Sequence, residues 1–375
     1  MLGRVAPRGP RPRGSASARL CGRCDRGLAL RRAAVAPDRR RGRRDTPRVV
    51  PTAILLDCDP GHDDAIALLL ALASPELEVL GVTTVAGNQT LEKTTANAIR
   101  VLDFIGRDDV PVAAGADRPL TRDPFVAAYV HGETGLDGPD LPPPQRDPLG
   151  RHAADFLAEQ IRERKGAVTP VPTGPLTNVA LLLALHPDAR PERIVLMGGA
   201  IAEGNVTPAA EFNIWCDPEA AARVFAGGID VTMIGLDVTH KALFGERHAA
   251  KLEGRVGEMV RELLAFYGSF HREAYGWDGS PIHDAVAVAK VSHPQLVETK
   301  HRGVKIDTES ELSRGRTLVD LWRRAPSSSQ RSHHTGRSPS RMRPARRFRA
   351  RRRRRPPWRS SAAGSTQCVR TRRSC

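Results

Sequence analysis

The segment Ile54-Leu55-Leu56-Asp57-Cys58-Asp59-Pro60-Gly61-His62-Asp63-Asp64 decides the fold that we predict for this chain. Its apolar beginning is typical of a buried strand, and Pro60-Gly61 is a strong turn signal. Asp63 and Asp64 then begin a helical pattern. They lie at its N-terminus, where the helix dipole favours negative charge. A strand that passes through a tight turn into a helix is the basic unit of an α/β sheet.

The rest of the chain, from residue 79 to residue 322, repeats this alternation of short apolar runs and longer helical patterns. The alternation predicts a single α/β domain at 51–322, with a mainly parallel sheet flanked by helices. Pro170 interrupts one predicted strand and removes a ladder hydrogen bond, so we expect weaker pairing there. Further strands are predicted at 79–85, 110–114, 167–172, 193–197 and 231–236, and helices at 63–72, 91–105, 151–164, 176–185, 218–225 and 247–275.

The charge of the chain is unevenly distributed. The whole sequence has a formal net charge of +16, but residues 1–50 contain 15 Arg and three Asp, and residues 323–375 contain 18 Arg and no acid. The middle, 51–322, therefore keeps 25 basic and 39 acidic residues, a net charge of −14. An acidic body repels phosphate, so we do not expect nucleic-acid binding except through the basic ends.

The two basic ends show no helical or strand periodicity, and Arg351–Arg355 is a run of five like charges. Segments of this composition bury too little apolar surface to fold, so we expect a disordered Arg-rich extension at 1–50 and a disordered Arg/Ser-rich tail at 323–375. A wrong reading frame in GC-rich DNA is rich in Arg, Pro, Ala, Gly and Ser codons. We therefore expect the ends to be non-native; the alternative is a functional basic tail.

Two further features concern the compartment. Only Cys58 and Cys216 of the six cysteines lie in the acidic body, which fits a reduced, cytoplasmic protein. The longest apolar run, Ala65–Ala73, is too short to cross a bilayer, and the N-terminus lacks the apolar stretch of a signal peptide.

The acidic cluster is the sharpest chemical feature of the sequence. Four carboxylates, those of Asp57, Asp59, Asp63 and Asp64, fall within eight positions after a strand. Carboxylates this close repel one another and have raised pKa values unless a cation lies among them. Ligands that offer only oxygen favour calcium or magnesium. The alternative is a capped helix with solvated acidic side chains.

Two protein families contain a cluster of this kind. The strand-end Asp57-Cys58-Asp59 resembles the DxD of haloacid-dehalogenase-like phosphatases, in which Asp57 would be the nucleophile and magnesium the cofactor. The body contains no convincing GDxxxD-type segment to complete that metal site. The full pattern DxDxxxDD, from Asp57 to Asp64, resembles the inosine–uridine-preferring nucleoside hydrolases instead.

The resemblance to nucleoside hydrolases continues from about Ala53 to Trp322. Several motifs of that family occur in this part of the chain, and their number makes chance similarity implausible. The matching segments are Val82–Asn88, His131–Gly135, Pro172–Asn178, Val195–Gly199, Glu203–Asn205, Glu211–Asn213 and His283-Asp284.

The resemblance implies hydrolysis of the N-glycosidic bond of a small-molecule ribonucleoside to free base and ribose, at the carboxyl ends of the strands. It implies that Asp59 takes the proton from a calcium-bound water and that His283 protonates the departing base. It also implies a homo-oligomer, a dimer or tetramer. The implied Ca²⁺ ligands are Asp59, Asp64, Asp284 and the backbone carbonyl of Thr173.

The resemblance also assigns the substrate contacts. Asp63 and Asn88 would bind ribose hydroxyls, and Met197 would pack against the sugar. His131 would lie in a flexible loop near the base. Asn205, Glu211 and Asn213 would orient the 5′ and 3′ side of the ribose. The residues do not decide between purine and pyrimidine nucleosides. A third reading is an inactive relic with tails that bind nucleic acid.

The family pattern ends near Trp322, whereas relatives continue with one more strand and a closing helix. We therefore expect the C-terminal strand and helix of the fold to be missing and replaced by the basic tail.

We predict a change of reading frame near the Trp322 codon, because charge, apolar periodicity and family resemblance all change there. Shifting the frame just after that codon in the gene should reveal an open frame that encodes an apolar strand and an amphipathic helix. Sequencing the gene tests this directly. If neither alternative frame contains such a segment, the basic tail is genuine.

Overall fold

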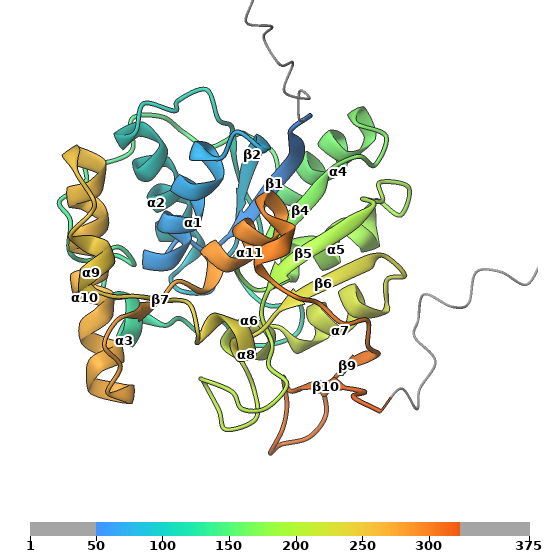
Figure 1. The fold of residues 1–375 in the computed structure, drawn as a ribbon. Helices are drawn as coiled ribbons and strands as arrows, with labels where there is room; N and C mark the ends of the chain where they lie inside the picture. Colours follow the sequence, from blue (N-terminus) through green and yellow to red (C-terminus); the bar gives the residue numbers. More distant parts are fainter. Residues whose placement is uncertain (1–49, 323–375) are drawn as a thin grey trace, which may run out of the picture. The chain divides into compact units, whose positions relative to one another are not determined.

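Strand β1 (Thr52–Cys58) lies at the centre of the structure and is buried on both faces. It belongs to a computed structural model that describes residues 50–322 (Figure 1). The predictions of a disordered extension at 1–50 and a disordered tail at 323–375 lie outside the described residues, apart from Val50. The same is true of the frame change.

The central sheet is parallel and has the order β3-β2-β1-β4. A second parallel pair, β5 with β6, lies beside β4. These strands and their order confirm the predicted α/β class with a mainly parallel sheet. Their bounds are β2 (Leu77–Thr84), β3 (Val112–Ala114), β4 (Thr169–Pro172), β5 (Arg193–Met197) and β6 (Asp230–Ile234).

The prolines of β4 explain why the two groups of strands remain separate. Thr173, just after β4, donates its amide hydrogen to the Asp57 carbonyl of β1 at 2.8 Å. Because amides alternate along a strand, those of positions 170 and 172 would point the other way, toward β5. Pro170 and Pro172 have no amide hydrogen to donate there. The expected weak pairing therefore falls between β4 and β5, and the ladder with β1 is intact.

Helices cover both faces of the sheet because β1 alternates its side chains between them (Figure 1). Ile54 and Leu56 pack on the face of α1 and α11, and Leu55 packs with Leu157 and Ile161 of α4 on the other face. The first face has α1 (His62–Ala73), α2 (Leu91–Phe104), α10 (Gly254–Tyr275) and α11 (His283–Ser292), and the second has α4 (Ala153–Glu163), α5 (Thr177–Leu185) and α7 (Pro218–Ala226).

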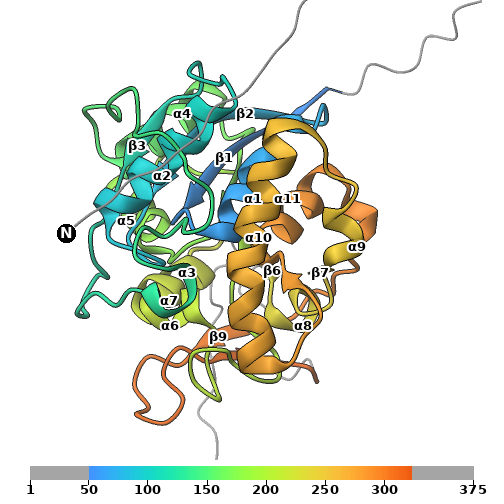
Figure 2. The ribbon, with the colours of Figure 1, turned by 90° about the vertical axis from the view of Figure 1, so that its left-hand side faces the viewer.

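Short elements fill the connections. The predicted helix at 247–275 is interrupted between α9 and α10, where Gly254 has a φ of +69°. Helix α10 then runs on and packs against α1 (Figure 2). The remaining elements are α3 (Ala128–His131), α6 (Phe212–Cys216), α8 (Leu236–Thr239), α9 (Glu246–Ala249), a 3₁₀ turn (Pro294–Leu296), and two antiparallel pairs, β7 (Leu243–Phe244) with β8 (Ser280–Pro281) and β9 (Val304–Ile306) with β10 (Thr317–Val319).

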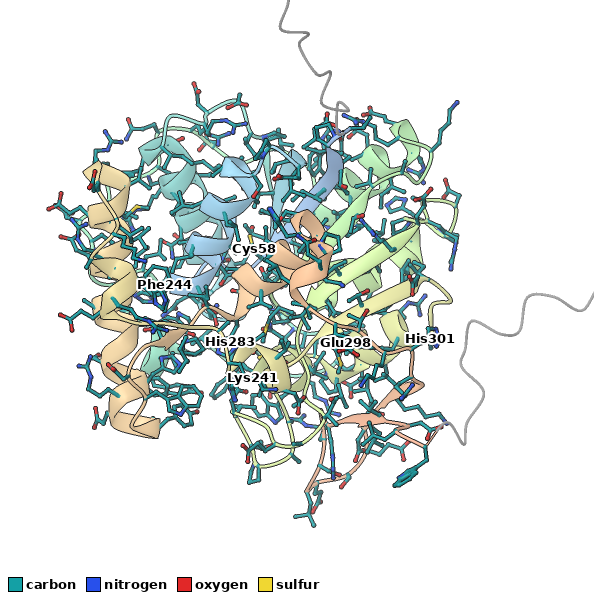
Figure 3. All side chains as sticks on the ribbon, in the orientation of Figure 1. Cys58, Lys241, Phe244, His283, Glu298 and His301 are labelled. Carbon is teal, nitrogen blue, oxygen red and sulfur yellow. The ribbon has the colours of Figure 1, made fainter. Side chains whose placement is uncertain are left out.

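The two cysteines of the body, Cys58 and Cys216, are buried and have free thiols (Figure 3 labels Cys58). Within residues 50–322, no helix combines the length and the apolar character that crossing a bilayer requires.

We predict that Leu55→Ala lowers the free energy of unfolding by about 2–5 kcal/mol, because Leu55 is 0% exposed and its removal leaves a cavity beneath the sheet. Urea denaturation measures the change. The matched control is Leu312→Ala, since Leu312 is 91% exposed and its truncation should alter stability by less than about 0.5 kcal/mol. Equal effects of the two substitutions would contradict the central position of β1.

Candidate active site

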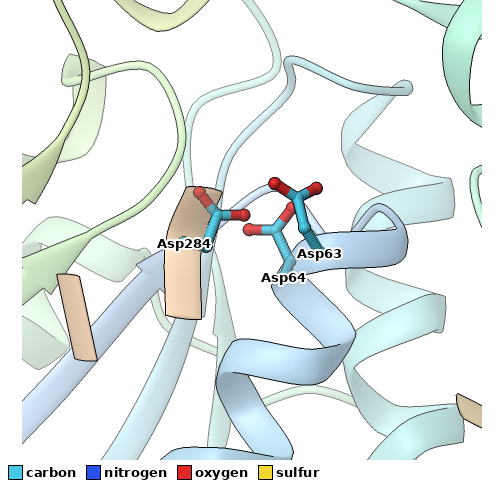
Figure 4. A group of neighbouring side chains, drawn as sticks. All are labelled: Asp63, Asp64 and Asp284. Carbon is cyan, nitrogen blue, oxygen red and sulfur yellow. The ribbon is translucent and has the colours of Figure 1, made fainter. Parts of the chain in front are cut away.

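Carboxylates from three places in the chain meet at the carboxyl end of β1. Asp57 and Asp59 come from β1 and the turn after it, and Asp63 and Asp64 begin α1. Asp284 arrives from the first turn of α11. Oxygen atoms of Asp63, Asp64 and Asp284 lie within 4.8 Å of one another, and Figure 4 shows the three side chains converging. The sequence-predicted cluster is thus joined by the late Asp284.

Glycines allow the backbone to close around Asp59. A Cβ atom at Gly87 would lie 2.1 Å from Asp59 Oδ2, and one at Gly174 would lie 2.6 Å from Asp59 Oδ1. Neither position can carry a side chain without moving the carboxylate. The loops after β2 and β4 therefore enclose Asp59 from two sides, and Asp59 is 0% exposed.

Neighbouring donors orient the carboxylates. The Asn88 backbone amide donates to Asp59 Oδ2 at 2.7 Å, and the Asn88 side-chain amide donates to Asp64 Oδ2 at 3.0 Å. The Thr173 hydroxyl donates to Asp64 Oδ1 at 2.9 Å. Asp59 Oδ1 is buried and has no hydrogen-bonding partner within residues 50–322. This orphaned oxygen is free to bind a cation or a water molecule.

The electrostatics of the cluster favour a bound cation. Burial, followed by repulsion from Asp64, raises the pKa of Asp63 to about 8 and that of Asp59 well above its usual value. Burial also raises the pKa of Asp284, to which Asp63 and Asp64 add repulsion. No Lys or Arg is among the described residues that line the adjoining cavity. A bound cation would let these groups ionise together.

Asp57 has a different position from its neighbours. Its Oδ1 accepts hydrogen bonds from the Thr83 hydroxyl at 2.7 Å and from Asn178 at 2.8 Å. The side chain is 0% exposed and does not line the cavity. Burial raises the pKa of Asp57 to about 6. This position offers no support for the phosphatase hypothesis, which needs Asp57 as a nucleophile that meets the substrate.

The cavity beside the cluster brings together most of the residues that the sequence singled out. Asp59 and Asp64 are absent from its lining, but they bond to the lining residues Asn88 and Thr173. The predicted residues in the lining are Asp63, Asn88, His131, Thr173, Met197, Asn205, Glu211, Asn213, His283 and Asp284.

The side of the cavity formed by α6 is held by Glu211. Its carboxylate caps the helix by accepting from the amides of Asn213 and Ile214, and it also accepts from Gly199 at 2.8 Å. The Asn213 side chain donates to the Thr173 carbonyl at 2.7 Å and lies 3.4 Å from the Met197 sulfur. Glu211 and Asn213 are thus linked to the strand ends that carry Thr173 and Met197.

The opposite side of the cavity is lined by histidines and other aromatic rings. His131 and His283 are both buried, and burial lowers the pKa of His283 to about 3 (Figure 3 labels His283). His283 Nδ1 shares a hydrogen bond with the Thr239 hydroxyl at 2.8 Å. Further rings of the lining were not among the predicted site residues, including those of His240, Tyr267, His271, Tyr275 and Trp277.

A signal for three of these residues was present in the sequence. Tyr267, His271 and Tyr275 are four residues apart, so they occupy one face of α10. His271 stacks on Trp277 with ring centroids 6.0 Å apart. A face of rings at this spacing is usually core, and only the packing of α10 places it at a cavity.

An α/β sheet with buried carboxylates and a cavity lined largely by aromatic rings at its strand ends is typical of an enzyme active site. A family model described as inosine-uridine preferring nucleoside hydrolase matches residues 54–346. The chain belongs to this family. The predicted reaction class, hydrolysis of the N-glycosidic bond of ribonucleosides, is thereby confirmed.

Individual relatives support the same family. A pyrimidine-specific ribonucleoside hydrolase of Shewanella baltica is 53% identical over 275 residues, which cover 72% of this chain and 86% of that protein. A plant nucleoside hydrolase structure has a TM-score of 0.69 and 34% identity, covering 76% of this chain and 90% of its own. The structure of a purine-preferring ribonucleoside hydrolase from Gardnerella vaginalis has a TM-score of 0.69 and 35% identity, covering 72% and 88%.

We predict that the metal-free protein loses stability between pH 6.5 and pH 8. The pKa of Asp63 is about 8 in the folded state, whereas an unfolded carboxyl titrates near pH 4. The folded protein therefore keeps a proton that the unfolded chain has lost, and rising pH favours unfolding. Buried histidines, whose pKa values are lowered, oppose this trend only below about pH 6.5.

Chemical denaturation in the presence of a calcium chelator measures this effect. The slope should approach about 1.4 kcal/mol per pH unit for each retained proton. Asp63→Asn should make this slope less steep, because one of the retained protons is lost. Added calcium should stabilise the protein most at pH 8. Stability that stays constant or rises across this window would contradict the assignment of raised pKa values.

Proposed function

We propose that this protein hydrolyses pyrimidine ribonucleosides with the help of a bound Ca²⁺ ion. The observation that carries the proposal is the group of buried carboxylates beside a cavity whose described lining contains no Lys or Arg. The pyrimidine preference rests on the 53% identity to a pyrimidine-specific relative, against 35% to a purine-preferring one.

The residues present fit a calcium ion. Asp59, Asp64, Asp284 and the Thr173 carbonyl would hold it, and no Lys or Arg of the described cavity lining competes for these carboxylates. An all-oxygen set of this size, shared between carboxylates and a carbonyl, suits Ca²⁺ better than the strict octahedron of Mg²⁺. When bound, the ion would hold the ribose hydroxyls and make the attacking water more acidic.

Asp59 is the residue that we assign as the general base. Its Oδ2 is held by the Asn88 amide, so its Oδ1 remains available to take a proton from water. The enclosing Gly87 and Gly174 prevent the carboxylate from turning away. A general base fixed in this way needs no reorientation before it takes the proton from water.

The sugar would lie between the carboxylates and α6. Asp63 and Asn88 would bind ribose hydroxyls, and Met197 would pack against the ring. Asn205, Glu211 and Asn213 would orient the 5′ and 3′ side. Asn213 is already fixed by its bond to the Thr173 carbonyl.

The nucleobase would lie against the aromatic side of the cavity, whose described lining includes the rings of Tyr267 and Trp277. His131 would contact the base, and His283 would assist its departure. Burial lowers the pKa of His283, so its ring is neutral at pH 7 and would supply a hydrogen bond from its N–H. We also propose that the protein is a cytoplasmic homo-oligomer, a dimer or a tetramer.

Ribose release from uridine, cytidine, inosine and adenosine, with calcium or with a chelator, tests the proposed function. Uridine and cytidine should be cleaved at least about tenfold more efficiently than the purine nucleosides, a difference of about 1.4 kcal/mol. Chelation should abolish release, and calcium should restore it. Equal cleavage of all four would overturn the pyrimidine preference, and activity that survives chelation would overturn the metal assignment.

We predict that Asp59→Asn lowers kcat by at least about 10²-fold, because general-base help is typically worth 10²–10⁴-fold. Circular dichroism should show an intact fold, since Asn fills the same space between Gly87 and Gly174. Leu312→Ala, on an exposed turn, serves as the active control. A variant that keeps more than about a tenth of the wild-type rate would remove Asp59 from the role of base.

A further inference from the structure

The loop that carries His131 is tied through Asn97 of α2 to the turn before α1. Gln89 donates to the Gly132 carbonyl at 2.8 Å, and Asn97 donates both to the Thr134 carbonyl at 2.8 Å and to Pro60 at 3.2 Å. The loop was expected to be flexible, yet these bonds join it to the turn that precedes Asp63 and Asp64. The loop beside the proposed position of the nucleobase is therefore connected to the carboxylate end of the cavity.

His62 makes the most direct of these connections. Its Nε2 lies 2.8 Å from the Asp137 carbonyl oxygen, which can only accept, so Nε2 carries a proton and donates it. Its Nδ1 lies 3.2 Å from His131 Nδ1, and its backbone amide lies 3.3 Å from the same atom. One of the two holds His131 Nδ1 at a time: a protonated Nδ1 donates to the His62 ring, and an unprotonated Nδ1 accepts from the His62 backbone amide.

Ring packing fixes the plane of His62 as well. Its ring is nearly parallel to those of Phe266 and Tyr267, with centroids 5.1 Å and 5.5 Å apart and angles of 3° and 5°. His131 stacks on His62 at 5.4 Å and on Tyr267 at 5.4 Å. A ring enclosed in this way cannot turn without displacing α10.

His62 and His131 differ in what they can reach. His62 is 0% exposed and does not line the cavity, so it cannot touch a substrate. His131 does line the cavity. The held nitrogen is Nδ1, and the nitrogen left for a ligand is Nε2.

We propose that His62 is a positioning residue, which holds the His131 ring so that Nε2 meets the nucleoside base. This inference rests on the proposed function, in which His131 contacts the base. Because His62 directly precedes Asp63 and Asp64, one turn of the chain sets both the carboxylates and the base contact. His62 acts on the reaction only through His131.

Two substitutions separate the two hydrogen bonds of the His62 ring. In His62→Asn the amide occupies the place of Nδ1 and keeps the contact with His131. In His62→Gln the amide occupies the place of Nε2 and keeps the contact with Asp137. The substrates are uridine and 4-nitrophenyl β-D-ribofuranoside, whose leaving group has no pyrimidine ring to contact His131.

His62→Gln should lower kcat/KM for uridine by about tenfold or more, with less than about threefold loss on the nitrophenyl riboside. His62→Asn should keep more of the uridine activity than His62→Gln. In a His131→Ala background, His62→Gln should cause no further loss on uridine, because both residues act through one contact. The calcium concentration for half-maximal activity should stay unchanged in the His62 variants.

Equal losses of His62→Gln on both substrates, or losses that add to those of His131→Ala, would overturn the inference, because a merely structural role affects all substrates alike. His62→Gln activity equal to wild type would also overturn it. Failure of the proposed function looks different: the wild-type protein would then cleave neither substrate, and the inference would fall with it.

Discussion

The structure depends on one electrostatic constraint, the burial of carboxylates that carry no matching positive charge. Asp59, Asp63, Asp64 and Asp284 are each at most 5% exposed, and the described cavity lining contains neither Lys nor Arg. Burying such charges unpaired is prohibitively costly, so their pKa values rise until a cation joins them. The protein thus stores a strong preference for a hard cation at the place where the sugar would bind.

The fold places hydrogen-bond donors at fixed positions around these carboxylates. Parallel strands end at a common edge, so loops after β2 and β4 both reach the turn after β1. Asn88 and Thr173 donate from those loops to Asp59 and Asp64, and glycines leave room for them to approach. The prolines of β4 remove no hydrogen bond between β4 and β1, because the positions that lack an amide hydrogen face β5.

Much of the fold and part of the site could be predicted from the sequence. Apolar runs and helical periods located β1 to β6 and most of the long helices, since both patterns are local properties of the chain. The short strands β7 to β10 and the helices α3, α6, α8 and α11 were not predicted. The resemblance to nucleoside hydrolases added Asp284 and the residues of the cavity wall. The ring contacts of His62 and the aromatic face of α10 were not predicted, because a buried ring and a functional ring look the same in a sequence.

The sequence by itself determined that four carboxylates leave a buried strand through a Pro-Gly turn, and this is enough for an α/β enzyme with a cation site. Only the tertiary structure decided how the carboxylates are arranged around one another. Asp57 turns to Thr83 and Asn178, whereas Asp284 arrives from the last long helix to join Asp63 and Asp64. The physical reason is that alternation and helical spacing act over a few residues. The meeting of α1 with α11, by contrast, depends on how the whole apolar core packs between them.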